Sequence, residues 1–343
     1  MEFLANTWKR FLCQWLLAWV FTLSVQGQVQ WDVMQHEGRD YVSLQNLKTF
    51  YNFPSMKRAG NDLILEGKNL IFKLKVGSQE VTLNGVKFIC TYPVIESGGK
   101  IGISRIDLTK LIDPVLRPSY IPNAGSFRTV VLDAGHGGKD AGAVNAYNTE
   151  KAYNLRVAQE LKTLLMAKGF KVVMTRSSDV YLTLQERVDL ANAVKEQAIF
   201  ISIHFNSGGR SARGVETFTL SPQGVAHYGS GLKSSDFQLR NGNLHDSANV
   251  ALATAVHGQV IRHLGKENTF DRGIKRARYS VLTGVRHPAI LVEGGFMSHP
   301  YEARLMENPK YISAVARGIS DAVTLYQKAV SFRKPGTAPA RNP

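Results

Sequence analysis

The segment Thr129-Val-Val-Leu-Asp-Ala-Gly-His-Gly-Gly138 decides the fold of this 343-residue chain. It opens with apolar and β-branched residues in a row, a pattern typical of a strand buried on both faces of a parallel sheet. Asp133 ends the run, and a glycine-rich turn then carries His136. Glycine allows backbone conformations closed to other residues and leaves space beside the histidine. Ligands of open α/β sheets bind beyond the carboxyl ends of strands, so His136 is either a site residue or a structural histidine of the turn.

The residues that follow alternate between predicted helices and predicted strands. One helix ends at Gly169, and another opens at Thr183 with Glu186 three residues later, the pattern of a capping box. The predicted strands are 170–175, 198–203, 214–220 and 289–293, and the predicted helices are 150–167, 183–194, 247–264 and 312–326. This alternation predicts an α/β fold with a mostly parallel sheet and helices on both faces.

Four side chains of this part of the chain form a candidate metal site. His136, His204 and Glu293 come at the ends of predicted strands, and Glu150 begins the helix after the glycine-rich segment. Taken singly, Glu150 could serve the helix dipole and His204 could be a structural histidine, whereas Glu293 would be a costly buried charge without a partner. Two histidines and a carboxylate with an open position are the ligands of a catalytic zinc ion, and a second carboxylate supplies a general base.

Six blocks in this order resemble the zinc-dependent N-acetylmuramoyl-L-alanine amidases of the Amidase_3 family, over about residues 127–326. The blocks are Leu132-Asp-Ala-Gly-His-Gly-Gly138, Thr149-Glu-Lys151 with Asn154-Leu155, Thr175-Arg176, Ser202-Ile-His-Phe-Asn206, Asp271-Arg-Gly-Ile-Lys275 and Val292-Glu-Gly-Gly-Phe-Met-Ser298. The resemblance implies a phosphorylase/hydrolase-like fold and hydrolysis of the amide between N-acetylmuramic acid and L-alanine in peptidoglycan. It also implies that His136, Glu150 and His204 bind Zn²⁺ and that Glu293 is the catalytic carboxylate. Gly294 and His299 depart from the usual family pattern beside that acid.

Two other functions remain open at this point. A zinc peptidase on a related sheet would keep the metal and cleave a peptide bond instead. A non-catalytic cell-wall-binding protein would keep the fold, although it has no need of all four site residues. Arg176 and Asn206 could help to stabilise an oxyanion, and Arg176 and Arg187 could equally anchor the structure. The glycine- and serine-rich stretch between Leu220 and Ser247 predicts no stable helix, so it leaves autoinhibition and a protein activator open.

The N-terminus predicts export. Lys9-Arg10 precedes an apolar run from Phe11 to Val25 that is short for a membrane span, and small residues follow it. This is the pattern of a cleaved signal peptide, with an uncleaved anchor as the alternative, and it predicts a periplasmic or cell-wall-associated protein without a stable membrane anchor after cleavage. Cys90 then remains as a single cysteine, which excludes an internal disulfide.

The rest of the chain divides by composition. Residues 28–118 contain short alternating segments and an Asn84-Gly85 turn, and they weakly resemble the copper amine oxidase-like N-terminal domain. The net charge of +15 indicates either a polyanionic partner or a generally basic surface. The basic residues are scattered and form no nucleic-acid-binding motif, and composition alone does not choose the partner. The resemblance implies that the partner is peptidoglycan and not nucleic acid. The predicted parts are a signal peptide (1–27), a small β-rich domain (28–118), a linker (119–126), a catalytic domain (127–328) and a disordered basic tail (329–343).

Overall fold

The computed structural model describes residues 31–122, 124–265 and 269–331. The predicted signal peptide lies outside these residues, and so does the predicted tail from residue 332 onward. All described residues belong to one compact unit. Within these three ranges, no helix combines the length and the hydropathy that a membrane crossing needs.

The predicted catalytic part of the chain is built on a mostly parallel sheet, which confirms the predicted fold class. Its strands run in the order β11-β10-β12-β15-β13-β14, and only β13 and β15 pair antiparallel. The strand bounds are β10 (Thr129–Ala134), β11 (Lys171–Met174), β12 (Ala198–Asn206), β13 (Val215–Leu220), β14 (Asp271–Ala277) and β15 (Ala289–Phe296). All six residues of β10 are buried, as its apolar run predicts.

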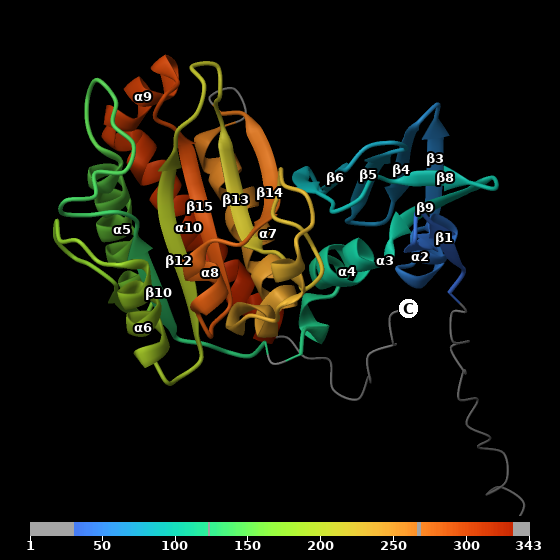
Figure 1. Cartoon of the computed structure of the whole chain (residues 1–343), viewed down its shortest axis with the longest axis horizontal. Helices are drawn as coiled ribbons and strands as arrows, with labels where there is room; N and C mark the ends of the chain where they lie inside the picture. Colours follow the sequence, from blue (N-terminus) through green and yellow to red (C-terminus); the bar gives the residue numbers. More distant parts are fainter. Residues whose placement is uncertain (1–30, 123, 266–268, 332–343) are drawn as a thin grey trace, which may run out of the picture. The chain divides into compact units, whose positions relative to one another are not determined.

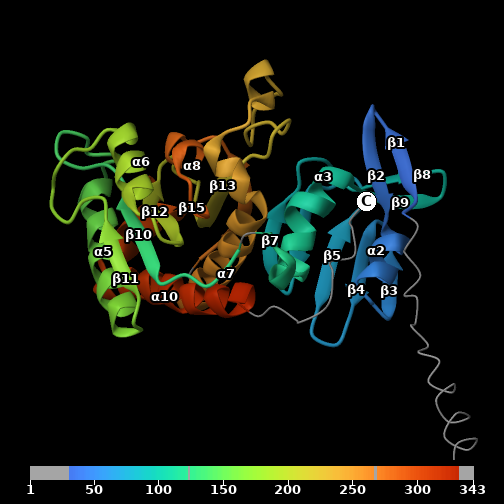
Figure 2. The ribbon, with the colours of Figure 1, turned by 90° about the horizontal axis from the view of Figure 1, so that it is seen from below.

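Helices cover both faces of this sheet (Figure 1). The helices α5 (Glu150–Ala167), α7 (Asp246–Leu264) and α10 (Pro309–Ser331) contact one another or the strands on one face. Figure 2 shows α6 (Leu184–Ala193) and α8 (Ser280–Gly284) on the side opposite α10. The predicted capping box opens α6, with Thr183 and Glu186 hydrogen-bonded to each other's backbone. The short helices α8 and α9 (Pro300–Glu307) were not predicted, and α10 extends through residues 329–331 of the predicted tail.

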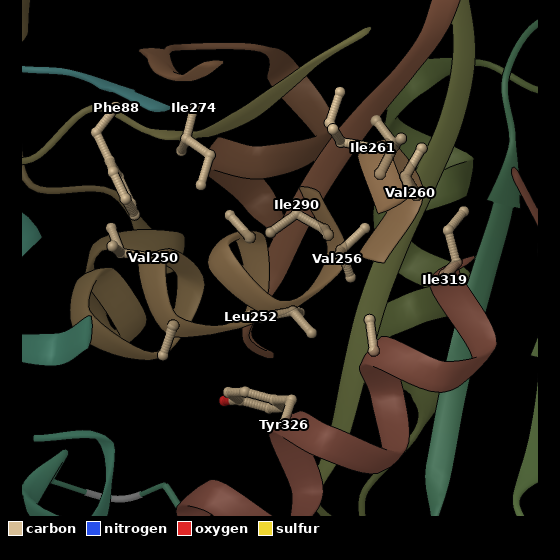
Figure 3. Close-up of a cluster of buried hydrophobic side chains, with 14 of the residues drawn as sticks. Phe88, Val250, Leu252, Val256, Val260, Ile261, Ile274, Ile290, Ile319 and Tyr326 are labelled. Carbon is tan, nitrogen blue, oxygen red and sulfur yellow. The ribbon is translucent and has the colours of Figure 1, made fainter. Parts of the chain in front are cut away.

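The main hydrophobic core lies between the sheet and α5, α7 and α10. Figure 3 shows Ile290 of β15 beside Leu252 and Val256 of α7, with Ile319 and Tyr326 of α10 close to them. A smaller core packs α6 and α8 against the opposite face. Because both faces of the sheet are buried, its strands contain runs of apolar residues instead of alternating apolar and polar residues.

The N-terminal part is the predicted small antiparallel β domain. Its strands are β1 (Val33–His36), β2 (Arg39–Ser43), β3 (Ser55–Ala59), β4 (Asp62–Glu66), β5 (Ile71–Lys75), β6 (Glu80–Leu83), β7 (Val86–Ile89), β8 (Ile95–Ser97) and β9 (Lys100–Ser104). The first sheet has the order β1-β2-β9-β8, and α2 (Leu44–Phe50) follows β2. Strands β3 to β7 form a meander, and Asn84 and Gly85 both have positive φ in the predicted turn between β6 and β7.

Two features of this part differ from the sequence interpretation. Strand β7 pairs in parallel with β14 at Phe88 and Ile274, so the meander extends the catalytic sheet to eleven strands. Residues 105–120, at the end of the predicted β-rich domain and the start of the predicted linker, are also largely helical. They form α3 (Arg105–Asp107), a π-helical turn (Leu108–Ile112), α4 (Asp113–Leu116) and a 3-10 turn (Pro118–Tyr120). Pro114 and Pro118 stand in the first turns of these short helices, where the missing N–H costs nothing.

Candidate metal centre

His136 stands in a turn that a buried ion pair holds at the end of β10. Asp133 accepts hydrogen bonds from Thr175 (2.7 Å), Ser202 (2.8 Å) and Arg187 (2.8 Å), so its buried charge is fully paired. Arg187 also donates to the carbonyl of His136 at 2.7 Å. His136 has φ 60°, a left-handed conformation that non-glycine residues adopt rarely and mainly where function requires it.

Glu150 is the first residue of α5, and its carboxylate joins the two histidines. Its Oε2 lies 3.2 Å from Nε2 of His136, and its Oε1 lies 2.9 Å from Nδ1 of His204. Burial acts to raise the pKa of Glu150, but the hydrogen bonds from His136 and His204 outweigh burial and hold it well below its ordinary value. The carboxylate is therefore ionised, as a metal ligand must be.

His204 lies inside β12, which runs to Asn206, rather than after the end of the predicted strand. The structure thus brings three of the four predicted site residues into one cluster, from the turn after β10, the start of α5 and the end of β12 (Figure 1). One ligand atom from each of His136, Glu150 and His204 lies within 4.8 Å of the other two. Among the described residues, this is the group of His, Cys, Asp and Glu side chains that could hold a metal ion.

Two glycines leave the space that this cluster occupies. A Cβ atom on Gly135 would lie 2.1 Å from Cε1 of His204. A Cβ atom on Gly142 would lie 2.6 Å from Oε2 of Glu150 and 2.7 Å from Cδ2 of His136, and the residue has φ +64°. Both glycines are therefore required by the close approach of the ligand side chains.

Asp140 and Asn154 orient the ligands, and the sequence interpretation assigned neither of them a role. The Asp140 carboxylate can only accept, so Nδ1 of His136 donates to it at 2.8 Å, and Nε2, which faces Glu150, is the ring nitrogen available to a metal ion. Asn154 donates to the carbonyl of Gly135 at 3.1 Å and lies 3.4 Å from Oε1 of Glu150. Such outer partners fix the tautomer and orientation of metal-binding histidines. The spacing of four residues between His136 and Asp140 is the feature of the sequence that could have indicated this contact.

Glu293 lies inside β15, beside His204 in the parallel pair with β12. It is 9% exposed, and its Oε2 atom has no hydrogen-bond partner among the described residues. Burial, together with the charges of Glu150 and Glu216, raises its pKa well above the ordinary value of a glutamate. A carboxyl group in this state is suited to hold and release a proton.

A cavity of about 520 Å³ contains Glu293 and both histidines of the cluster. Its wall also includes Tyr181, Leu184, Arg278, Tyr279 and Ser280. Burial, with Glu293 and Glu216 nearby, raises the pKa of Tyr279 to about 12, so its phenol remains a neutral hydrogen-bond donor. The two histidines of the cluster, the candidate base and a partly aromatic wall therefore face one space.

Arg176, Arg187 and Asn206 have structural partners. Arg176 donates to the carbonyl oxygens of Ala134, Gly135, Lys151 and Ser178. The amide of Asn206 donates to Glu216 at 2.6 Å, and its oxygen accepts from the backbone of Ser207. Both Arg176 and Asn206 therefore have structural contacts, and the hypothesis that one of them stabilises an oxyanion stays a prediction.

The stretch between Leu220 and Asp246 contains two 3-10 turns, Ser234–Phe237 and Asn241–His245, and no α-helix, as its glycine content predicts. Arg278 fixes this stretch to the cavity wall. Its Nε donates to Asp236 at 2.7 Å, and its Nη2 donates to the carbonyl oxygens of Pro222, Val225 and Asp236.

The sequence model of the family described as N-acetylmuramoyl-L-alanine amidase (Amidase_3) matches residues 130–325, more than half of the chain. The chain belongs to this family. The matched range contains His136, Glu150, His204 and Glu293, as well as Asp140 and Asn154.

Individual amidases and related proteins match the same region. The protein named uncharacterized protein YqiI of Bacillus subtilis is 34% identical over 199 residues, covering 58% of this chain and 84% of that protein. The amidase AmiC of Escherichia coli is 33% identical over 244 residues, and the match spans 64% of this chain and 58% of AmiC. The germination-specific amidase of B. subtilis is 30% identical, with 83% of its length covered. Among solved structures, the catalytic domain of the amidase CwlV from Bacillus (Paenibacillus) polymyxa is 32% identical, with a TM-score of 0.49, and the match covers 59% of this chain and 99% of that domain.

Proposed function

We propose that this chain is a zinc-dependent N-acetylmuramoyl-L-alanine amidase that hydrolyses the amide bond between N-acetylmuramic acid and L-alanine in peptidoglycan. The convergence of His136, Glu150 and His204 beside Glu293, in a chain of the amidase family, supports this proposal. The residue types and their arrangement match a metal-assisted hydrolysis rather than a covalent mechanism, because the cavity wall presents a buried base instead of an activated nucleophile.

His136, Glu150 and His204 are the residues that would hold the zinc ion. Two imidazoles and one carboxylate with an open position are a usual donor set for catalytic zinc, and Gly135 and Gly142 keep the space between the donors free. When bound, zinc supplies Lewis-acid polarisation of a carbonyl and a more acidic water molecule. Asp140 keeps the Nδ1 proton of His136 away from the metal side of the ring.

Glu293 performs the proton transfers in this proposal. The carboxylate accepts a proton from the attacking water as the new C–O bond forms at the lactyl carbonyl carbon. It then returns that proton to the alanine nitrogen as the C–N bond breaks, so the products are a free carboxylic acid and a free amine. The raised pKa of Glu293 favours the first step, because a more basic carboxylate accepts the proton of water more readily.

The cavity wall suits an amphipathic substrate. Tyr181 lies beneath the ammonium of Lys139, 4.5 Å from the ring centroid, and Leu184 and Tyr279 add further apolar surface. Sugar and peptide groups of peptidoglycan can pack on such surfaces, while carboxylates of the stem peptide are attracted by the net positive charge of the chain.

The remaining proposals concern the location and the N-terminal domain. Residues 1–27 act as a cleaved signal peptide, which places the enzyme in the periplasm or at the cell wall without a membrane anchor. The β-rich domain is of the copper amine oxidase-like N-terminal type, and it holds the catalytic domain near its polymeric substrate.

Analysis of the products from purified muropeptides tests the proposed reaction. The zinc-loaded protein is incubated with a muropeptide, and the products are identified by mass spectrometry after labelling of new amines. We expect intact stem peptides with a free L-alanine amine and sugars with a free lactyl carboxylate. Cleavage between two amino acids of the stem would identify a peptidase, and binding without any new amine would identify a cell-wall-binding protein.

A further inference from the structure

Four strands place ionisable side chains side by side on the cavity face of the sheet. His204 of β12 lies beside Glu293 of β15 in the parallel pair, and Glu216 of β13 lies directly opposite Glu293 in the antiparallel pair. Residues opposite each other share one face of a sheet. Lys275 of β14 pairs with Phe218, two residues from Glu216, so it belongs to the same face. The candidate base therefore has a second carboxylate as one of its two cross-strand neighbours.

Glu216 has charged or polar partners at both of its oxygens. Its Oε2 accepts from the ammonium of Lys275 and from Nε of Arg272 at 2.8 Å. Its Oε1 accepts from the amide of Asn206 at 2.6 Å. Two like charges directly across a strand pair destabilise each other, and these three donors offset that repulsion.

Lys275 is a buried cation with Glu216 as its carboxylate partner. Its side chain is 4% exposed and that of Glu216 is 5% exposed. The ammonium also lies 4.5 Å from the ring centroid of Tyr228 and 5.9 Å from that of Phe218. A buried ammonium without an anionic partner is costly, so loss of Glu216 would drive Lys275 toward another carboxylate on this face. Glu293 is the adjacent one, and its Oε2 has no hydrogen-bond partner among the described residues.

We propose that Glu216 is a positioning residue for Glu293. Glu216 binds the Lys275 ammonium and so prevents it from pairing with the carboxylate that must accept the proton of water. This inference rests on the proposed function of Glu293. It assigns a positioning role to a buried carboxylate that is not among the described residues lining the cavity.

Three variants test the inference: Glu216→Gln, Lys275→Met and the double variant. We expect Glu216→Gln to lose about 100-fold in kcat, the scale of losing a general base, with zinc content and KM close to those of the wild type. Lys275→Met leaves Glu216 paired with Arg272 and Asn206, so its kcat should fall much less. The double variant should recover at least about tenfold over Glu216→Gln, because contacting residues couple on this scale.

Asp107→Asn is a matched control for the loss of a buried carboxylate. Asp107 pairs at 3.0 Å with Arg276, which follows Lys275 on β14 and points to the other face. We expect this variant to lower the thermal midpoint and to keep kcat. A merely structural role for Glu216 predicts instead that the double variant is no better than Glu216→Gln.

Each outcome separates this inference from the proposed function. A wild-type protein without amidase activity contradicts the proposed function itself. An active wild type together with an unimpaired Glu216→Gln variant, or with no recovery in the double variant, contradicts the positioning role. If Glu216→Gln does not fold, the kcat of Lys275→Met tests the proposal instead. A loss of about 100-fold or more in that kcat overturns the proposal, because Lys275 would then be needed for the reaction itself.

Discussion

At the scale of single residues, the site depends on one carboxylate that contacts both histidines. Glu150 lies within 3.2 Å of His136 and within 2.9 Å of His204, although its sequence neighbourhood also fits an ordinary first-turn acid. His136, His204 and Glu293 could be proposed from the sequence because strand ends and a glycine-rich turn indicate where ligands bind, and the structure brings the two histidines together with Glu150. Asp140 could not be assigned a role, since its contact with His136 depends on the left-handed backbone of the turn.

Gly142→Ala tests whether the space between the ligands is required. A Cβ atom would approach Glu150 and His136 to less than 3 Å, so we expect a large loss of bound zinc. Gly169→Ala is the matched control, because Gly169 also has positive φ and nothing lies within 4 Å of an added Cβ. The control should cost only the conformational strain, about 1 kcal/mol of unfolding free energy, and keep its zinc. Equal zinc content in the two variants would refute the argument. Elemental analysis and chemical unfolding provide the two readouts.

At the scale of elements, apolar runs predicted five of the six strands of the catalytic part, β10 among them. The sixth strand, β14, was not predicted. Its sequence contains Arg272, Lys275 and Arg276, which read as exposed residues in a hydropathy pattern. The structure pairs all three with acidic side chains, Arg272 and Lys275 with Glu216 and Arg276 with Asp107. A strand whose buried side chains are charged and ion-paired has no periodic pattern of apolar residues. Such a strand therefore cannot be predicted from the hydropathy of the sequence.

Arg278→Ala tests the anchoring of residues 222–238. The guanidinium makes charge-assisted hydrogen bonds to Asp236 and to three carbonyl oxygens of this stretch. Losing even one such bond costs about 1.5 kcal/mol or more of local stability, so limited proteolysis within residues 222–238 should become about tenfold faster. Arg210→Ala, which removes an exposed arginine outside the stretch, serves as the control. Unchanged cleavage of Arg278→Ala would show that other contacts hold the segment.

At the scale of the whole molecule, the main hydrophobic core contains residues of both the β-rich part and the catalytic part. Phe88 of β7 packs beside Ile274 of β14 and Val250 of α7 (Figure 3). The pairing of β7 with β14 joins segments far apart in the sequence, and neither segment carries a pattern that specifies its partner. The sequence patterns therefore predicted a β-rich part and a mostly parallel sheet. They could not predict that β7 of the first is hydrogen-bonded to β14 of the second.

Phe88→Ala tests this coupling. Removing a fully buried phenylalanine side chain should lower the free energy of unfolding by about 3–5 kcal/mol. Because the main core contains residues of both parts, circular dichroism and amidase activity should be lost together in one urea transition at a lower midpoint. Phe237→Ala, at a side chain that is 56% exposed, should leave the midpoint nearly unchanged. A separate early transition that leaves activity intact would show that the β-rich part unfolds on its own.

The central claim is that two carboxylates beside the same cavity do different work: Glu150 binds zinc and Glu293 transfers protons. The most direct test is the zinc content of purified Glu293→Gln, measured by elemental analysis on the sample used for turnover. We expect about one zinc per chain, because the three ligands remain, and a loss of activity of at least about 100-fold, because only the proton acceptor is gone. Glu150→Gln should lose most of its zinc under the same conditions. A Glu293→Gln protein purified without zinc, or one that retains full activity, would contradict the account.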